Sequence, residues 1–395
     1  MKIGFVGLGN LGREAAEVIS QHYDLEGYDI RKIDTTVRQV SLNKVCEDKD
    51  IIFIAVPTPH DRDYDGREPT SHLPPKDFDY SIVKEVICQV DSIITKDTLI
   101  VLISTCLPGT VRENFEPLVK RGRFIYNPYL IAQSTVKWDM VNPEMVIVGT
   151  KDGDKSDDAA TILKFYEKFI AKDTRYVVGT WEEAEGIKIF YNTFISAKIT
   201  LVNMIQDVAM KVGNMNVDVV TKALRDSDKR IMGPSYMTAG LGDGGGCHPR
   251  DNIALSSTVE KYDLKYDLFK SIMEARELQA KNLAEFMMDY NNPIVIVGQA
   301  FKPGIDQVHG SPSLLVAYYC EERGFEVYYD EVPEGPKPLT FMLHDYEMFK
   351  TLRIPDNSII VDVFRKLDYI IKGSTIIKYG NTRNETNTTK LPERH

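Results

Sequence analysis

The strongest constraint on the fold of this chain is a Gly-x-Gly-x-x-Gly loop that directly follows an apolar run near the N-terminus. The first glycine of such a loop makes the turn, the second lets a pyrophosphate approach, and the third lets helix and strand pack together. Because the loop stands between a strand pattern and a helical pattern, it predicts a dinucleotide-binding fold; a glycine turn without a ligand is the alternative. The loop residues expected to face the phosphates are Gly7, Gly9, Asn10, Leu11 and Gly12.

An acidic residue about twenty positions after the loop predicts which dinucleotide binds. Asp29 ends the second expected strand, where a carboxylate can accept a hydrogen bond from a ribose 2′-hydroxyl. The same carboxylate would repel the additional phosphate of NADP, so the sequence favours NAD as the cofactor. Arg31 lies close enough to keep NADP open as an alternative.

The rhythm of apolar runs predicts an α/β fold with three regions. Residues 1–178 alternate short Ile- and Val-rich runs with amphipathic stretches, which is typical of a Rossmann domain with buried parallel strands. Residues 179–290 form a central helical domain, and residues 291–395 return to a smaller, Rossmann-like α/β domain. The expected strands cover 3–7, 51–56, 99–104, 123–126, 145–149, 294–298, 326–329, 358–361 and 375–379, and the expected helices cover 181–212 and 251–290, with a break near Asp263.

Composition excludes several classes of function. A net charge of −10 argues against a general surface for nucleic acid or anionic membranes, and no apolar run approaches the roughly 20 residues of a membrane helix. Five scattered cysteines fit neither a disulfide framework nor the spacing of a zinc site. Together with an N-terminus unlike a signal peptide, these features predict a cytoplasmic protein without a metal.

A cysteine after three glycines, Gly244 to Gly246, is the strongest candidate for a nucleophile. If a helix begins near Pro249, Cys247 lies at its N-terminus, where the partial positive charge favours the thiolate. Asp251 then falls in the first turn on the side of the cysteine, next to a possible covalent intermediate. A tight loop with a buried cysteine is the alternative. A Cys-His hydrolase is disfavoured because the adjacent His248 would seldom face Cys247.

Two further groups of polar side chains are candidates for a catalytic role. Lys188 and Asn192 are four residues apart on an expected helix and share a face, where they could hold a developing alkoxide; a solvated helix face is the alternative. Thr105 follows an expected strand at the carboxyl end of the sheet, where it could position water. Its neighbour Cys106 is expected to pack in the core.

Taken in order, these segments resemble the UDP-glucose/GDP-mannose dehydrogenase family over nearly the whole chain. The resemblance implies an NAD domain, a helical middle that forms a homodimer, and a C-terminal domain that helps to hold a nucleotide sugar. The matching segments are the glycine loop, 56–59, 104–110, 142–149, Lys188 with Asn192, 230–234, 244–251, 298–303 and 311–313.

The resemblance implies a four-electron oxidation of the sugar C6 alcohol to a carboxylate by two NAD, in a pathway toward a polysaccharide. UDP-glucose is the expected substrate. Cys247 would form the thiohemiacetal and thioester, Lys188 and Asn192 would assist the oxyanion, and Asp251 and Thr105 would position water. Implied cofactor contacts include Val56, Pro57, Thr58, Ser104, Thr105 and His309. Implied substrate contacts are Tyr129, Leu130, Lys188, Asn192, Arg230, Tyr236, Gly244, Gly245, Phe301 and Lys302.

Departures from the family pattern leave alternatives open. Tyr129 and Gln133 stand where the family has acidic residues, one of which is thought to aid hydrolysis. Arg250 replaces a lysine, and His309 replaces an arginine expected at the cofactor. The alternatives are a two-electron dehydrogenase of the hydroxyacid type, an oxidation that stops at the aldehyde or thioester, and a non-catalytic sensor of nucleotide sugars.

Overall fold

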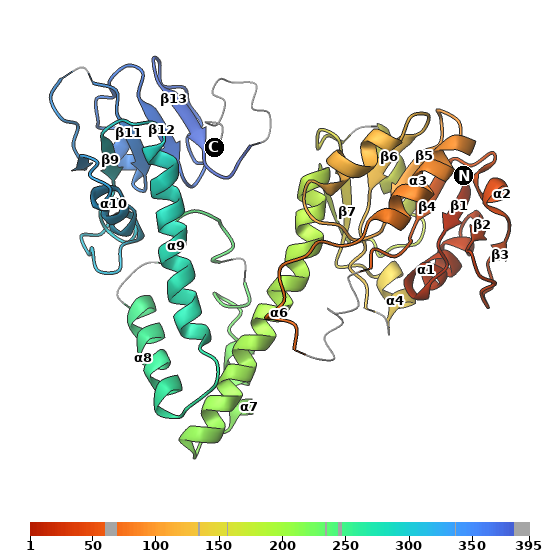
Figure 1. Ribbon diagram of the computed structural model, residues 1–395, viewed down its shortest axis with the longest axis horizontal. Helices are drawn as coiled ribbons and strands as arrows, with labels where there is room; N and C mark the ends of the chain where they lie inside the picture. Colours follow the sequence, from red (N-terminus) through yellow and green to blue (C-terminus); the bar gives the residue numbers. More distant parts are fainter. Residues whose placement is uncertain are drawn as a thin grey trace. The chain divides into compact units, whose positions relative to one another are not determined.

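The computed structural model describes residues 1–59, 69–132, 135–155, 157–233, 235–243, 247–335 and 337–382. The chain divides into two compact units, Met1–Ala197 and Lys198–His395 (Figure 1). A parallel sheet in the first unit, long helices in the middle of the chain and a second parallel sheet confirm the predicted α/β class.

The first unit is built on an eight-stranded sheet with the order β3-β2-β1-β4-β5-β6-β7-β8, in which only the β6–β7 pair is antiparallel. All five strands predicted by position are present, and so is the one expected to end near Asp29. Two short or edge strands, β3 and β8, were not predicted. The strands are β1 Lys2–Val6, β2 Asp24–Tyr28, β3 Arg38–Gln39, β4 Ile51–Ile54, β5 Leu99–Leu102, β6 Arg123–Tyr126, β7 Met145–Thr150 and β8 Arg175–Thr180.

Both faces of this sheet are covered, which explains why its central strands are apolar throughout. Along β4, Ile51 and Phe53 pack into one hydrophobic cluster, whereas Ile52 and Ile54 pack into another. The covering and connecting segments are α1 Asn10–Ser20, α2 Leu42–Cys46, α3 Ser81–Ile93, the π-helical turn η2 Val111–Phe115, the 3₁₀ turn η3 Glu116–Leu118, α4 Val136–Val141 and α5 Asp157–Tyr166.

Helix α6 spans Trp181–Val212, as predicted, and the boundary between the two units falls within it. A reciprocal cap fixes its start: the Glu183 N–H donates to Thr180 Oγ1 at 3.2 Å, and the Thr180 N–H donates to Glu183 Oε2 at 2.9 Å. This cap fixes where the helix begins and therefore which residues its first turns present.

The second unit combines helices with a five-stranded parallel sheet of order β10-β9-β11-β12-β13. The predicted break near Asp263 is confirmed, since this residue has a φ of +52° between α8 and α9. The elements are α7 Val217–Arg225, α8 Cys247–Lys261, α9 Leu268–Met288, β9 Ile294–Val297, α10 Pro312–Glu322, β10 Val327–Tyr329, β11 Thr340–Leu343, α11 Tyr346–Phe349, β12 Ile359–Asp362 and β13 Thr375–Lys378.

Strand β11 was not predicted, although it is fully buried between β9 and β12. It is only four residues long and follows Pro336 and Pro338, so its sequence is typical of a loop leading into an ambiguous apolar run. The structure therefore adds one central strand to the expected four.

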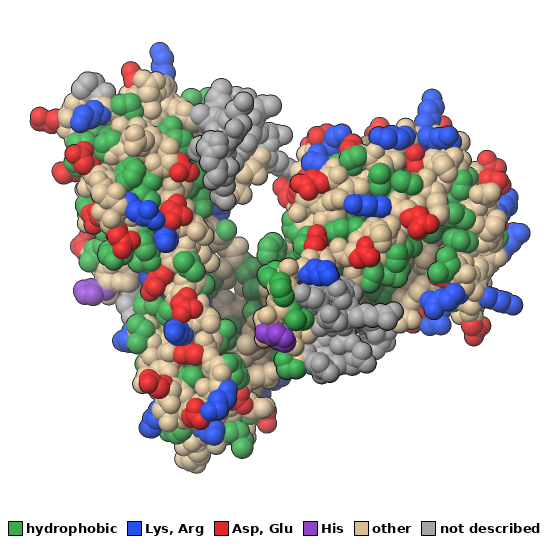
Figure 2. Space-filling model, in the orientation of Figure 1, with side chains coloured by type: hydrophobic (Ala, Val, Ile, Leu, Met, Phe, Trp, Pro, Cys, Tyr) green, Lys and Arg blue, Asp and Glu red, His purple; other side chains and the backbone are tan. Residues whose placement is uncertain are grey.

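The surface carries intermingled charges of both signs on the face of each unit shown in Figure 2. None of the helices in the described parts of the chain combines the length and apolar character needed to cross a membrane.

Candidate functional site

The three glycines of the N-terminal loop occupy three different environments. Gly7 has a φ of +98°, and a Cβ there would lie 2.4 Å from the carbonyl oxygen of Ala55. A Cβ on Gly12 would lie 2.0 Å from the carbonyl oxygen of Gly7, whereas a Cβ on Gly9 would meet no atom within 4 Å. The first and third glycines are therefore required by the fold, and the space beside the second is open for a ligand.

Helix α1 begins directly after this space. Gly9 occupies its N-cap position and provides no side-chain hydrogen bond to the first turn, whose N–H groups are therefore suited to bind phosphate. The carboxylate of Asp29 lies at the same loop, where it accepts hydrogen bonds from the Leu8 N–H at 2.9 Å and the Arg31 N–H at 3.0 Å. The Arg31 guanidinium lies 4.0 Å from this carboxylate and is largely exposed.

Two more predicted segments lie at the same edge of the sheet, because β1, β4 and β5 are parallel neighbours. The Ser104 hydroxyl donates to the carbonyl oxygen of Val56 at 2.6 Å, and the Thr58 hydroxyl donates to the carbonyl oxygen of Thr105 at 2.9 Å. The structure thus brings together the loop that includes Pro57 and the loop that carries Ser104 and Thr105. Cys106 is fully buried, in agreement with a packing role.

Lys188 lies on α6 and reaches back to the segment that follows β6. Its ammonium donates to the carbonyl oxygen of Tyr129 at 2.8 Å, and burial lowers the pKa of this lysine. Asn192 follows one turn later on the same helix and is exposed. The predicted shared face is thus present on a real helix, with a half-buried cation and an exposed amide.

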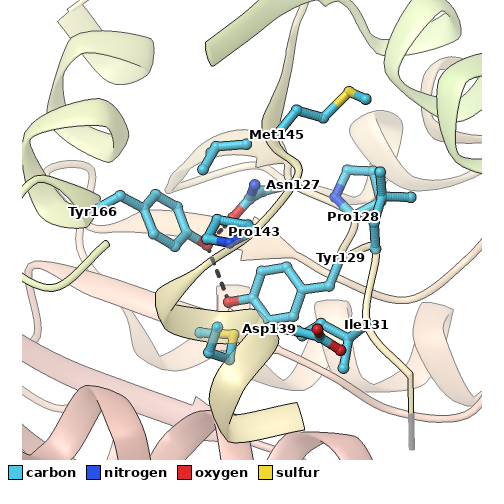
Figure 3. Close-up of a pocket in the computed structure, with 11 residues that line it drawn as sticks. Asn127, Pro128, Tyr129, Ile131, Asp139, Pro143, Met145 and Tyr166 are labelled. Atoms are coloured by element: carbon cyan, nitrogen blue, oxygen red, sulfur yellow. Dashed lines mark hydrogen bonds between the residues drawn. The ribbon is translucent and has the colours of Figure 1, made fainter. Parts of the chain in front are cut away.

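Tyr129 turns its hydroxyl into a small pocket behind this carbonyl (Figure 3). The hydroxyls of Tyr129 and Tyr166 lie 3.1 Å apart, and Tyr166 also donates to the amide oxygen of Asn127. Burial raises the pKa of Tyr129, so its phenol stays neutral. At this position the chain offers a backbone acceptor to Lys188 and no side-chain carboxylate. Leu130 is next in the chain and lines the same pocket.

Glu185 is a residue that the sequence analysis missed. It lies on α6 one turn before Lys188, is 0% exposed, and accepts hydrogen bonds from the backbone of the loop after β5. The available signal was one of three glutamates at the start of α6, the one three residues before Lys188. That signal alone does not distinguish a buried acid from one on the solvated face.

Cys247 is the first residue of α8, so its predicted place at a helix N-terminus is confirmed. The thiol belongs to an exposed residue, and the alternative of a buried cysteine is therefore wrong. The Arg250 guanidinium pairs with Asp251, with its Nε 2.9 Å from Oδ1, and it also interacts with Cys247, which together raise the pKa of Arg250. The first turn of α8 thus gathers a thiol, a carboxylate and a fixed cation.

His248 faces a carboxylate, since its Nδ1 lies 3.7 Å from Asp243 Oδ2. The same Asp243 accepts a 2.7 Å hydrogen bond from Arg276 Nε, and Arg276 is anchored by the carbonyl oxygen of Gly310. This pairing gives His248 a partner other than the neighbouring cysteine.

The remaining predicted contacts lie on the surface of the second unit or outside the described residues. Phe301 is half-buried, and the Lys302 ammonium lies 5.7 Å from its ring centroid. Exposed residues are Arg230, Tyr236, Lys302 and His309. Gln133, Pro234, Gly244 and Gly245 lie outside the described residues. The ligand-binding roles of these residues stay predictions.

Comparison with known proteins identifies the same family for two parts of the chain. The NAD binding domain of the UDP-glucose/GDP-mannose dehydrogenase family matches residues 31–170, and the central domain of that family matches residues 182–277.

Individual relatives give the extent of the similarity. A UDP-glucose 6-dehydrogenase of Rickettsia prowazekii is 28% identical over 276 residues, which cover 68% of this chain and 59% of the relative. A GDP-mannose 6-dehydrogenase of Pseudomonas putida is 28% identical over 262 residues, covering 62% of this chain and 58% of the relative. The chain thus spans about three fifths of the length of these relatives. A crystal structure of GDP-mannose dehydrogenase from Pseudomonas aeruginosa has the same fold, with a TM-score of 0.80 at 21% identity, over 95% of this chain and 99% of that chain.

Proposed function

The chain belongs to the UDP-glucose/GDP-mannose dehydrogenase family, and from this premise we propose that it oxidises the C6 alcohol of a nucleotide sugar to a carboxylate. NAD is the cofactor, because residues 31–170 form the NAD binding domain of the family. The observation that carries the proposal is the shared sheet edge where the open space at Gly9, the Asp29 carboxylate and the Thr105 loop occur together.

In the proposed mechanism, two NAD molecules, bound in turn at the Gly9 loop and the start of α1, would each accept one hydride. Lys188 receives the hydroxyl proton of the sugar, since the burial that lowers its pKa makes its neutral form easier to reach. Asn192, one turn further along α6, donates to the oxygen that develops negative charge. Both residues are polar groups on one helix, so a single rigid element positions them.

Cys247 supplies the covalent step of the proposal. Its sulfur adds to the aldehyde carbon to give a thiohemiacetal, which loses a hydride and its hydroxyl proton to become a thioester. Water positioned by Asp251 and Thr105 then attacks the carbonyl carbon, the C–S bond breaks, and the thiol is restored as the acid leaves. The net change consumes one alcohol, two NAD and one water, and it yields one carboxylate, two NADH and three protons.

The substrate is proposed to be UDP-glucose, with UDP-glucuronate as the product. The relatives described above are named for UDP-glucose and for GDP-mannose at the same 28% identity, so both sugars belong in the assay. Tyr129 supplies no carboxylate for the hydrolytic step. The key experiment therefore tests whether the oxidation proceeds to the carboxylate.

We expect two NADH and one uronic acid per molecule of limiting UDP-glucose, measured by absorbance at 340 nm and by the mass of the product. GDP-mannose and UDP-N-acetylmannosamine are assayed in parallel. One NADH with an aldehyde, or with an adduct on Cys247, would mean that oxidation stops partway. Absence of NADH with all three sugars would contradict the proposed activity and favour a sensor that binds without turnover.

We further propose a homodimer that forms through the central helices. Helix α6 exposes several large apolar side chains, among them Phe190 at 66%, Ile199 at 52% and Met210 at 79% exposed. Such exposed apolar side chains make this long helix more apolar than a solvated helix, and a second copy can cover part of this surface symmetrically.

The expected mass in solution is therefore about twice 44.8 kDa by size-exclusion chromatography with light scattering. Ile199→Glu is expected to shift the protein toward the monomer, because a buried unpaired carboxylate is costly at an interface. Ile370→Glu, the same substitution at a side chain that is 92% exposed outside the central helices, is the control and should leave the mass unchanged. A monomeric wild-type protein at micromolar concentration would contradict the proposal.

A further inference from the structure

Glu185 is a buried carboxylate that binds backbone donors, with no cation among its hydrogen-bond partners in the described chain. Its Oε2 accepts from the Gly109 N–H at 2.6 Å, and its Oε1 accepts from the Val111 N–H at 2.7 Å. The Cys106 thiol also donates to Oε1 at 3.5 Å. All three donors belong to the segment that leaves β5, so one side chain of α6 holds most of this turn.

The turn needs such a partner for a physical reason. Gly109 has a φ of +95°, and the chain then enters the short turn η2. The first N–H groups of a helical turn have no acceptor within the turn, and leaving them buried without a partner is costly. Glu185 serves as a cap supplied by a different element.

The same loop is fixed from its other side. The Ser104 and Thr58 hydroxyls tie it to the segment after β4, and the Leu107 N–H donates to the Tyr80 hydroxyl at 3.2 Å. Glu185 connects it to α6, the helix that carries Lys188, and the Arg112–Glu182 pair joins the same helix directly after the loop. Because Glu185 binds the Gly109 N–H within the loop itself, this carboxylate contributes to the position of Thr105 relative to α6.

We propose that Glu185 is a positioning residue that clamps the Ser104–Thr110 loop to α6, and that the NAD site is fully formed only when this carboxylate is ionised. The inference rests on the proposed role of Ser104 and Thr105 as cofactor contacts. A carboxylate accepts both N–H groups, whereas the protonated acid turns its hydroxyl into a donor and loses one of the two bonds.

The pKa of Glu185 lies near neutral pH, so the charge of this carboxyl can be varied in an experiment. Burial raises its pKa to about 7, although the bonds from Val111 and Gly109 oppose this shift. The charged and titratable groups around it behave differently. Burial raises the pKa of Cys106, Tyr126 and Tyr80, and the Arg112–Glu182 pair lowers the pKa of Glu182 and raises that of Arg112. Among these groups, Glu185 alone changes charge near neutral pH.

The sign of the effect follows from this shift. As the pH rises through about 7, the clamp gains its second hydrogen bond and the affinity for NAD increases. Stability changes in the opposite direction: a carboxyl whose pKa is raised from 4.5 on folding favours the folded state at low pH, and this contribution is lost as the pH rises toward about 7.

The test is the affinity for NAD, measured by titration calorimetry from pH 5.5 to 8.5. For the wild-type protein we expect the affinity to rise about fivefold across this range, the effect of one hydrogen bond. Glu185→Gln can accept only one N–H and should bind weakly with little pH dependence. Glu183→Gln, which removes a carboxylate at the start of the same helix, is the control and should keep the wild-type profile.

A Glu185→Gln protein with the wild-type affinity and pH profile would overturn the inference. If that variant does not fold, the wild-type protein still decides the question, because NAD binding at pH 7 must then release protons, seen as a buffer-dependent enthalpy. Absence of proton release would also overturn it. Neither readout requires turnover, so failure of the clamp is distinct from failure of the proposed activity, which would appear as absence of NADH with every sugar.

Discussion

Replacing Cys247 with serine is expected to abolish formation of the uronic acid, lowering its rate by at least about a thousandfold. A serine hydroxyl ionises far less readily than a thiol and forms no thioester, so it cannot carry the covalent half of the proposed reaction. The position supports the prediction, because the thiol is exposed at the first residue of α8, beside Arg250 and Asp251. NADH formation and product mass with UDP-glucose measure the loss.

The matched control is Cys88→Ser. Cys88 is also exposed, but it lies in α3 and takes no part in the proposed mechanism. This variant should retain the wild-type rate. Unchanged acid formation in Cys247→Ser would refute the covalent mechanism and favour the two-electron alternative, in which this cysteine is a spectator. Formation of aldehyde with a single NADH would instead support a role for Cys247 in the second oxidation only.

Gly12→Ala should lower the folding stability, whereas Gly9→Ala should weaken the binding of NAD. At Gly12 the new methyl group would overlap the carbonyl oxygen of Gly7, and the strand and helix that meet there must move apart. The expected cost is about 3 kcal/mol or more of folding stability, measured by urea unfolding. At Gly9 the φ of −67° suits alanine and the methyl group meets open space, so stability should be unchanged.

Binding separates the two variants further. The open space at Gly9 is where the pyrophosphate of NAD is expected, so Gly9→Ala should fold normally and bind NAD at least about tenfold more weakly by calorimetry. Gly9→Ala is thus the folded control for Gly12→Ala. If Gly9→Ala bound NAD as tightly as the wild-type protein, the phosphate site would have to lie elsewhere.

Sequence patterns predicted the parts of the fold that rest on local order. The strands of the first sheet were found because central parallel strands are buried on both faces and therefore apolar throughout, as in β4. Helix α6 was found because its cap and its period lie within one segment. Strand β11 was missed because its burial comes from β9 and β12, which are remote in the sequence.

In the candidate site, too, features set by adjacent residues were predicted and features set by distant residues were missed. The glycine loop and the cysteine at the start of α8 each carry their chemistry in a few adjacent residues, so spacing alone predicts their structural setting. Glu185 was missed because its role depends on Gly109 and Val111, more than seventy residues earlier in the chain. Likewise, no pattern indicated that Lys188 binds the carbonyl oxygen of Tyr129 while the phenol turns toward Tyr166.

By itself the sequence determined the α/β class, the dinucleotide loop and the residue types available for chemistry, because periodicity, glycine placement and helix termini are properties of neighbouring residues. Only the tertiary structure decided which carboxylate is buried and which backbone oxygen receives the ammonium of Lys188. These depend on atoms that the fold brings together from distant segments, and burial, which sets the pKa of Glu185 and Lys188, exists only after that packing.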